Sequence, residues 1–218
     1  MSDLSRIPRK MLRYVALCLC AAAIMLAACS CAYKETPQEN TERMDFLAMS
    51  TEELSKYIEL GEYKELTVSV SEGESRGMAV WRAVESGSSV KQYPVAHVYY
   101  YKGQLETQYG YYAEQAGISY EEMLEEMGET EASILEQAKA MTKSDLVYAA
   151  IVKAESIEVG DGERQALFER YVEKYVSDYG YGNDYVRENM ADEIYGSMLY
   201  DKTTEFLLVN NTVGDAEE

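Results

Sequence analysis

Apolar residues in the second half of the chain recur with the period of an α-helix. After Pro94 they follow one another at steps of three or four residues: Val98, Tyr101, Leu105, Tyr109, Tyr112 and Ala116. This spacing places them on one face of a helix. Pro94 suits the first turn and Gly117 suits the end of such a helix. The pattern therefore predicts one amphipathic helix over residues 94–117.

A capping-box pattern marks the start of the next helix. Ser119 is followed three residues later by Glu122, and these side chains can satisfy the first backbone N–H groups of a helix. We expect a short helix that ends at Gly128 and carries four apolar residues on one side: Tyr120, Met123, Leu124 and Met127. A long helix is expected to follow, from about residue 130 to residue 156.

Two more helices are expected toward the C-terminus. Asp161 can cap a helix with a broad apolar face, which ends at the glycines of residues 180–182. Asn183 can open a last helix that runs to about Val209. The remaining residues, from 211 to 218, are expected to form an acidic, frayed tail.

One short strand is expected before these helices. Residues 63–70 alternate apolar and polar side chains and include β-branched residues, a pattern typical of strands. Residues 71–77 read as a turn or loop, and Trp81 is expected to be a packing anchor between the strand and the helices. The fold class is therefore mainly α, with a short β segment near residues 63–70.

The N-terminus has the pattern of a secretory signal. Four basic residues precede an uncharged run over residues 14–28 that ends in small residues; this run is short for a membrane span. The sequence Leu-Ala-Ala before Cys29 resembles a bacterial lipoprotein box, in which the cysteine becomes the lipidated first residue. An ordinary signal peptide, a retained anchor, or a cleavage site near Cys20 are the alternatives. All of them place the protein outside the cytoplasm, and the lipoprotein reading places it on the extracytoplasmic face of the cell membrane.

Cleavage before Cys29 divides the chain into four parts. They are a signal peptide over residues 1–28, a flexible tether over 29–57, a helical domain over 58–210 and the acidic tail. Losing four basic residues and one acidic residue changes the formal net charge from −19 to −22. All four cysteines stand at or before Cys31, so no disulfide framework is expected in the helical domain.

The charge and the residue counts exclude several classes of function. A strongly acidic chain repels phosphate backbones, so nucleic acid is not an expected partner. His97 is the only histidine; it is expected to be a partly exposed helix residue rather than a metal ligand or a base. The glutamates of residues 121–131 contain no calcium-loop motif and are read as a solvated face. No catalytic residue, metal or cofactor is expected.

Four segments resemble trigger factor in the order that family has them. Residues 60–68 (LGEYKELTV) resemble the lead-in to its prolyl isomerase domain, and residues 90–94 (VKQYP) resemble the start of its C-terminal domain. Residues 143–159 (KSDLVYAAIVKAESIEV) are the closest match, and residues 199–208 resemble its last helix. The resemblance implies an elongated, multi-helix chaperone domain of the SurA/trigger-factor-like peptide-binding type, whose partners are unfolded or nascent secreted polypeptides.

Two departures from that family change the expected function. The interval between Thr67 and Met78 is about a dozen residues, too short for an FKBP-type prolyl isomerase domain. A lipoprotein signal also stands where the family has its ribosome-binding domain. The resemblance therefore implies an ATP-independent holdase in protein folding and export. A scaffold lipoprotein with one specific partner is the alternative, and a prolyl isomerase is the least favoured reading.

Tyrosine is the residue type that best fits a holdase surface. The chain has 20 Tyr but only 3 Phe and 1 Trp, and tyrosine offers a large contact area with few rotors, while methionine adapts its shape to varied partners. Tyr101, Tyr109 and Tyr112 are expected in the core. The candidates for client contact are Tyr99, Tyr100, Tyr111, Met123 and Met127.

Overall fold

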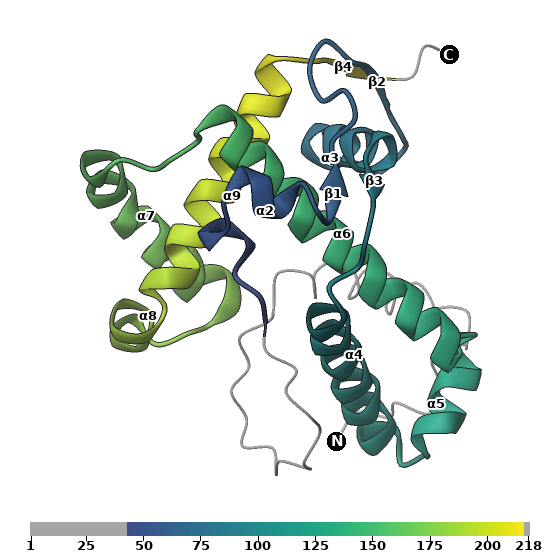
Figure 1. Cartoon of the computed structure of the whole chain (residues 1–218). Coiled ribbons are helices and arrows are strands. Elements are labelled where there is room, and N and C mark those ends of the chain that lie inside the picture. The colour runs from purple at the N-terminus through teal and green to yellow at the C-terminus, as the bar shows by residue number, and fades with distance from the viewer. Residues whose placement is uncertain (1–42, 216–218) are drawn as a thin grey trace.

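The chain folds into a mainly helical body with two helical arms (Figure 1). The structure is a computed structural model, and it describes residues 43–215. The predicted signal peptide, Cys29 and the tether up to residue 42 lie outside the described residues. No helix within residues 43–215 combines the length and the apolar character needed to cross a membrane.

The body is built from short elements at both ends of the described chain. They are η2 (Phe46–Ala48), α2 (Thr51–Leu54), β1 (Ile58–Glu59), β2 (Thr67–Val70), α3 (Arg76–Gly87), β3 (Ser89–Val90) and β4 (Thr212–Asp215). β1 pairs with β3 in antiparallel fashion, and β2 pairs with β4 in parallel, with Val68 opposite Val213.

The backbone of the segment after β1 closely approaches the end of α3 at Gly61, where an added Cβ would lie 2.2 Å from the carbonyl oxygen of Gly87. A side chain at position 61 would therefore push the two segments apart.

Two long helices, α6 (Glu131–Glu155) and α9 (Ala191–Val209), connect the body to the arms. α4 (Val95–Ala116), α5 (Tyr120–Met127) and the first half of α6 form the first arm. α7 (Asp161–Tyr179), α8 (Asn183–Asn189) and the first half of α9 form the second arm. The later halves of α6 and α9 pass into the body (Figure 1). Each of the three parts has its own buried cluster of apolar side chains.

The helices of the first arm begin and end where the local sequence predicts. Ser119 and Glu122 form the expected capping box of α5, and Gly117 and Gly128 close α4 and α5 with φ of 70° and 73°. Glycine adopts this left-handed conformation without the steric cost that a Cβ brings. The predicted helices over residues 94–117 and 119–128 are therefore confirmed.

The second arm differs from the prediction at two helix starts. Gly160, not Asp161, is the N-cap of α7, and Asp161 is its first helical residue, where its carboxylate faces the positive end of the helix dipole. The predicted last helix is two helices, because the chain leaves helical geometry at Met190 (φ −118°, ψ 19°). Neither glycine nor proline stands at this break, so the local sequence carries no signal for it.

The predicted tether and tail were too long. Phe46, Leu54 and Ile58 are all under 5% exposed in the body, so the chain joins the body well before residue 58. At the other end, residues 212–215 form β4 instead of a frayed tail. Of the strand expected over residues 63–70, only residues 67–70 form a strand, which is β2. The structure also contains β1, β3 and the helix α3, which the sequence pattern did not indicate.

Candidate functional site

Two tyrosines of α4 are exposed to solvent. Tyr99 is 49% exposed and Tyr111 is 57% exposed. Tyr100 is half-buried, with its ring centroid 5.4 Å from that of Tyr101. Tyr100 and Tyr111 are separated by about three full turns, roughly 16 Å along the axis, so they lie on one line of the helix. Tyr99 lies about 120° around the helix from Tyr111, so the two exposed rings point from different sides of α4.

The two methionine candidates lie elsewhere. Met123 is buried at 8% exposed and Met127 is half-buried. Both pack into the apolar cluster of the first arm, together with Tyr109, Leu124 and Ile134. Met123 is therefore not available on the surface of the arm for contact with a client. Its side chain packs α5 against α4 and α6. Tyr109 is buried as expected for the core.

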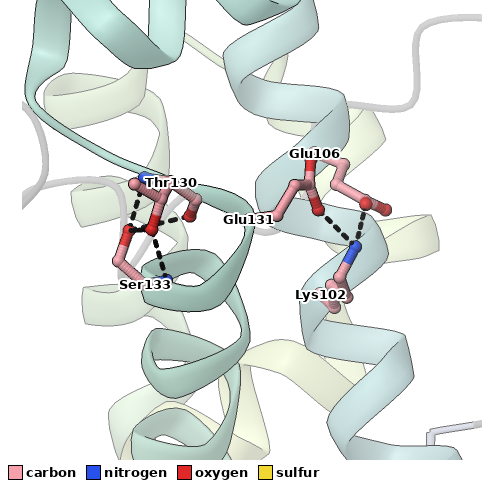
Figure 2. A network of polar contacts seen from close by, with 5 residues as sticks. All are labelled: Lys102, Glu106, Thr130, Glu131 and Ser133. Atoms are coloured by element: carbon pink, nitrogen blue, oxygen red, sulfur yellow. Dashed lines mark hydrogen bonds and ion pairs between the residues drawn. The ribbon is translucent and has the colours of Figure 1, made fainter.

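A lysine bridges the two long helices of the first arm (Figure 2). Lys102 on α4 donates to Glu106 on the same helix and to Glu131 at the start of α6, the latter at 2.9 Å. Partial burial works against its charge, but the bonds to the two carboxylates outweigh this and raise the pKa of Lys102. Thr130 and Ser133 cap α6 beside this bridge (Figure 2). The Lys102–Glu131 ion pair therefore ties α4 to the start of α6.

Carboxylates dominate the surface around the tip of the first arm. The exposed carboxylates there include Glu114, Glu121, Glu122, Glu125 and Glu126. The other two glutamates of the predicted solvated face have partners, because Glu129 accepts from Ser133 and Glu131 binds Lys102. Among residues 43–215, no group of acidic, histidine or cysteine side chains is arranged to hold a metal ion.

His97 is fully buried, contrary to the prediction of a partly exposed residue. Its Nδ1 lies 3.0 Å from the backbone nitrogen of Met44, and its Nε2 lies 2.9 Å from Oδ2 of Asp145 on α6. The hydroxyl of Tyr101 donates to the same carboxylate oxygen at 2.6 Å, and burial together with Asp145 raises the pKa of Tyr101. The prediction was wrong because both partners of His97 are distant in the sequence, one before it and one after it.

The second arm carries an aromatic cluster that the sequence analysis did not single out. Tyr175, Tyr179 and Tyr181 have ring centroids 5.5 to 6.5 Å apart at the turn between α7 and α8. Tyr181 stacks on Tyr185 at 6.0 Å, and Tyr185 is 42% exposed. The close spacing of tyrosines from residue 175 to residue 185 is the sequence feature that could have predicted this cluster. We call these four residues the α7–α8 tyrosine cluster.

Trp81 is the packing anchor that the sequence predicted. It is 6% exposed, its indole N–H donates to Thr204 at 2.8 Å, and its ring stacks on Tyr200 with centroids 5.3 Å apart. Tyr200 is itself 45% exposed, and the neighbouring Met78 on α3 is 56% exposed. Large apolar side chains are therefore exposed on α3 and α9 as well.

The structure is thus a helical body with two arms, and both arms expose tyrosine side chains. Residues 102–209 match the family described as the bacterial trigger factor protein C-terminus. The matched residues include most of both arms. Neither a curated protein nor a solved structure shows significant similarity to the chain.

Proposed function

We propose that the protein is an ATP-independent holdase that binds unfolded polypeptides on the outer side of the cell membrane. The proposal rests on two exposed tyrosines of α4, Tyr99 and Tyr111. The family match begins within this helix, at residue 102, and includes Tyr111. The family supports a chaperone-like role in general.

Binding alone is sufficient for this activity. A protein that binds the unfolded state lowers its free concentration by mass action, so aggregation slows without nucleotide or cofactor. Tyrosine rings supply contact area to many different sequences because each has an apolar face and a polar tip. The acidic surface around them, with Glu114 and Glu121 exposed, keeps such a surface soluble.

The proposed location rests on the sequence. The lipoprotein-type signal that ends before Cys29 supports lipid anchoring of the mature chain on the extracytoplasmic face. Two measurements test it: labelling of the cells with a radioactive or clickable fatty acid, and fractionation of the membranes. Replacement of Cys29 by serine should abolish the label, and a label that persists in the Cys29→Ser protein would contradict the assignment.

An aggregation assay tests the chaperone activity. A chemically unfolded model client is diluted into buffer with the protein at equimolar amounts, and light scattering is followed. We expect the wild type to suppress scattering. The Tyr99→Ser/Tyr111→Ser variant should need several times more protein for the same suppression, since it loses two exposed rings that support no core.

The matched control lies on the same helix. Gln104 and Thr107 are exposed polar residues of α4, and the Gln104→Ala/Thr107→Ala variant should suppress aggregation as the wild type does. No suppression by the wild type at any ratio would refute the holdase. Capture of one folded membrane protein in a fixed ratio would support the scaffold reading instead, and catalysis of proline-limited refolding would reveal an isomerase.

A further inference from the structure

We infer that His97 is an acid-released latch, which holds the segment of residues 43–47 onto the base of the first arm at neutral pH and lets it go when the imidazole is protonated. The geometry that carries this inference is a buried imidazole whose two nitrogens each contact a different part of the chain. The latch is independent of the proposed holdase activity, because it concerns how the N-terminal segment is held.

The hydrogen bonds assign the proton on the ring. A backbone N–H can only donate, so Nδ1 of His97 accepts from Met44 and carries no proton. Nε2 therefore carries the proton of the neutral ring and donates to Asp145. A second proton has one place to go, which is Nδ1. There it faces the N–H of Met44, and two donors 3.0 Å apart cannot bond to each other.

Protonation therefore has opposite effects on the two contacts. The contact with Asp145 becomes a charge-assisted hydrogen bond and strengthens, so α4 and α6 stay joined. The contact with Met44 is lost, and its N–H needs a new partner. Protonation of His97 therefore acts on the N-terminal segment and leaves the arm in place. Histidine side chains in general change charge between about pH 5 and 8, so this is the range that an experiment must cover.

The surroundings of the ring contain charges of both signs. Asp145 on α6 lies beside Nε2 of His97, and Arg43 on the N-terminal segment lines the pocket next to Asp145. Tyr100 and Tyr101 on α4 are neutral neighbours with ring centroids 6.1 and 5.1 Å from that of His97. Asp45 lines the same pocket as Asp145. Glu85 on α3 lies close enough to Asp145 and to Lys143 for their charges to act on it.

Release would uncover apolar surface on both sides of the contact. Phe46 packs its ring 4.5 Å from that of His97 and is 4% exposed. A pocket of about 250 Å³ lies between the segment and α6, with Met44 and Leu47 on one wall and Tyr148 on the other. One wall of this pocket belongs to the segment, so the apolar wall on α6 opens to solvent when the segment leaves.

A titration of the ¹⁵N-labelled protein by NMR tests the latch. His97 is the only histidine of the chain, so its ring nitrogens are assigned without ambiguity. We expect Nε2 to carry the proton at pH 8. The protection of the Met44 amide against exchange, corrected for the intrinsic rate, should then fall by about tenfold or more with the same midpoint as the ring.

Two variants separate the two nitrogens. In His97→Asn the side-chain oxygen takes the place of Nδ1, so Met44 should stay protected from pH 8 to pH 5. In His97→Gln the side-chain nitrogen takes the place of Nε2, so Met44 should be unprotected throughout. If either variant fails to fold, the titration of the wild type is sufficient by itself to test the latch. A proton on Nδ1 at pH 8, a ring that stays neutral down to pH 5, or Met44 protection that is unchanged while the ring titrates would each overturn the latch.

Discussion

Asn211 ties the end of α9 to the segment before β2 through its side chain. Its Oδ1 accepts from the backbone N–H of Leu66 at 2.7 Å, and its Nδ2 donates to the carbonyl oxygens of Tyr63 and Leu207 at 3.0 and 2.7 Å. These groups are partly buried, so each would lack a partner if the amide were removed. One side chain therefore holds together two segments from opposite ends of the described chain.

Substitution of this asparagine should destabilise the body. We expect Asn211→Ala to lower the free energy of unfolding by about 1–3 kcal/mol, because it leaves partly buried donors and acceptors without partners. Urea unfolding followed by circular dichroism measures the change. Asn189→Ala is the control: its side chain is exposed and donates only to Tyr185 of its own helix, so its effect should be within about 0.5 kcal/mol.

The contribution of Glu74 to the stability of the fold depends on pH. Its carboxylate accepts from Arg82 and from the backbone N–H of Ser71, and these bonds lower the pKa of Glu74 from 4.5 to about 2. The folded state therefore keeps Glu74 ionised at pH values where the unfolded chain has protonated it. The stability it contributes is present above pH 4.5 and is lost as the pH falls toward 2.

A comparison of the wild type with the Glu74→Gln variant across this pH range tests the direction of the pKa shift of Glu74. The advantage in unfolding free energy of the wild type over Glu74→Gln should be largest above pH 5 and should shrink steadily between about pH 4.5 and pH 2. Chemical denaturation at each pH measures it. An advantage that grows on acidification would contradict the assigned direction of the pKa.

At the scale of single elements, capping decides where the helices of the first arm start. Ser119 accepts from the backbone N–H of Glu122, and the Glu122 side chain accepts from the backbone N–H of Ser119 at 2.9 Å. These bonds satisfy N–H groups that have no partner within the helix. α5 has only eight residues, so it depends on its cap and on the apolar cluster more than a long helix does.

Removal of this cap should loosen α5. We expect Ser119→Ala to cost about 0.5–2 kcal/mol and to speed hydrogen exchange of the α5 amides, as measured by mass spectrometry. Ser86→Ala serves as the control, since the Ser86 hydroxyl donates only to Ala83 within α3. Exchange in α5 that matches the wild type would show that the apolar cluster alone holds the helix.

At the scale of the whole molecule, α6 and α9 join parts that have separate cores. α6 contributes Ile134 to the first arm and Leu146 and Ile151 to the body, all fully buried. α9 contributes Ile194 to the second arm and Leu207 to the body. The arms can therefore bend relative to the body only by bending these two helices.

The parallel pair of β2 and β4 closes the body. A chain that stops after Asn211 loses the side chain of Val213 and the ladder with β2, and it exposes Val68. We expect this truncation to lower the free energy of unfolding by about 2–4 kcal/mol, measured by urea denaturation. Val209→Ser, at a position 78% exposed, should change it little. A truncated chain as stable as the full one would show that β4 is dispensable.

Helix boundaries in the arms could be predicted because their causes are local. The caps at Ser119 and Thr130 and the glycines at positions 117, 128 and 180 act on the helix ends beside them in the sequence. The apolar period of α4 likewise needs only its own turn-to-turn repeat. The break at Met190, without glycine or proline, has no such local cause.

The candidate site divides in the same way. The sequence by itself determined that tyrosines crowd α4, that acids surround them, and that Trp81 is an anchor. Only the tertiary structure decided that Tyr99 and Tyr111 face outward, that Met123 packs inward, and that His97 is buried between Met44 and Asp145. The physical reason is distance along the chain: exposure and partners depend on elements that are remote in the sequence and adjacent only in the fold, and a local pattern does not encode them.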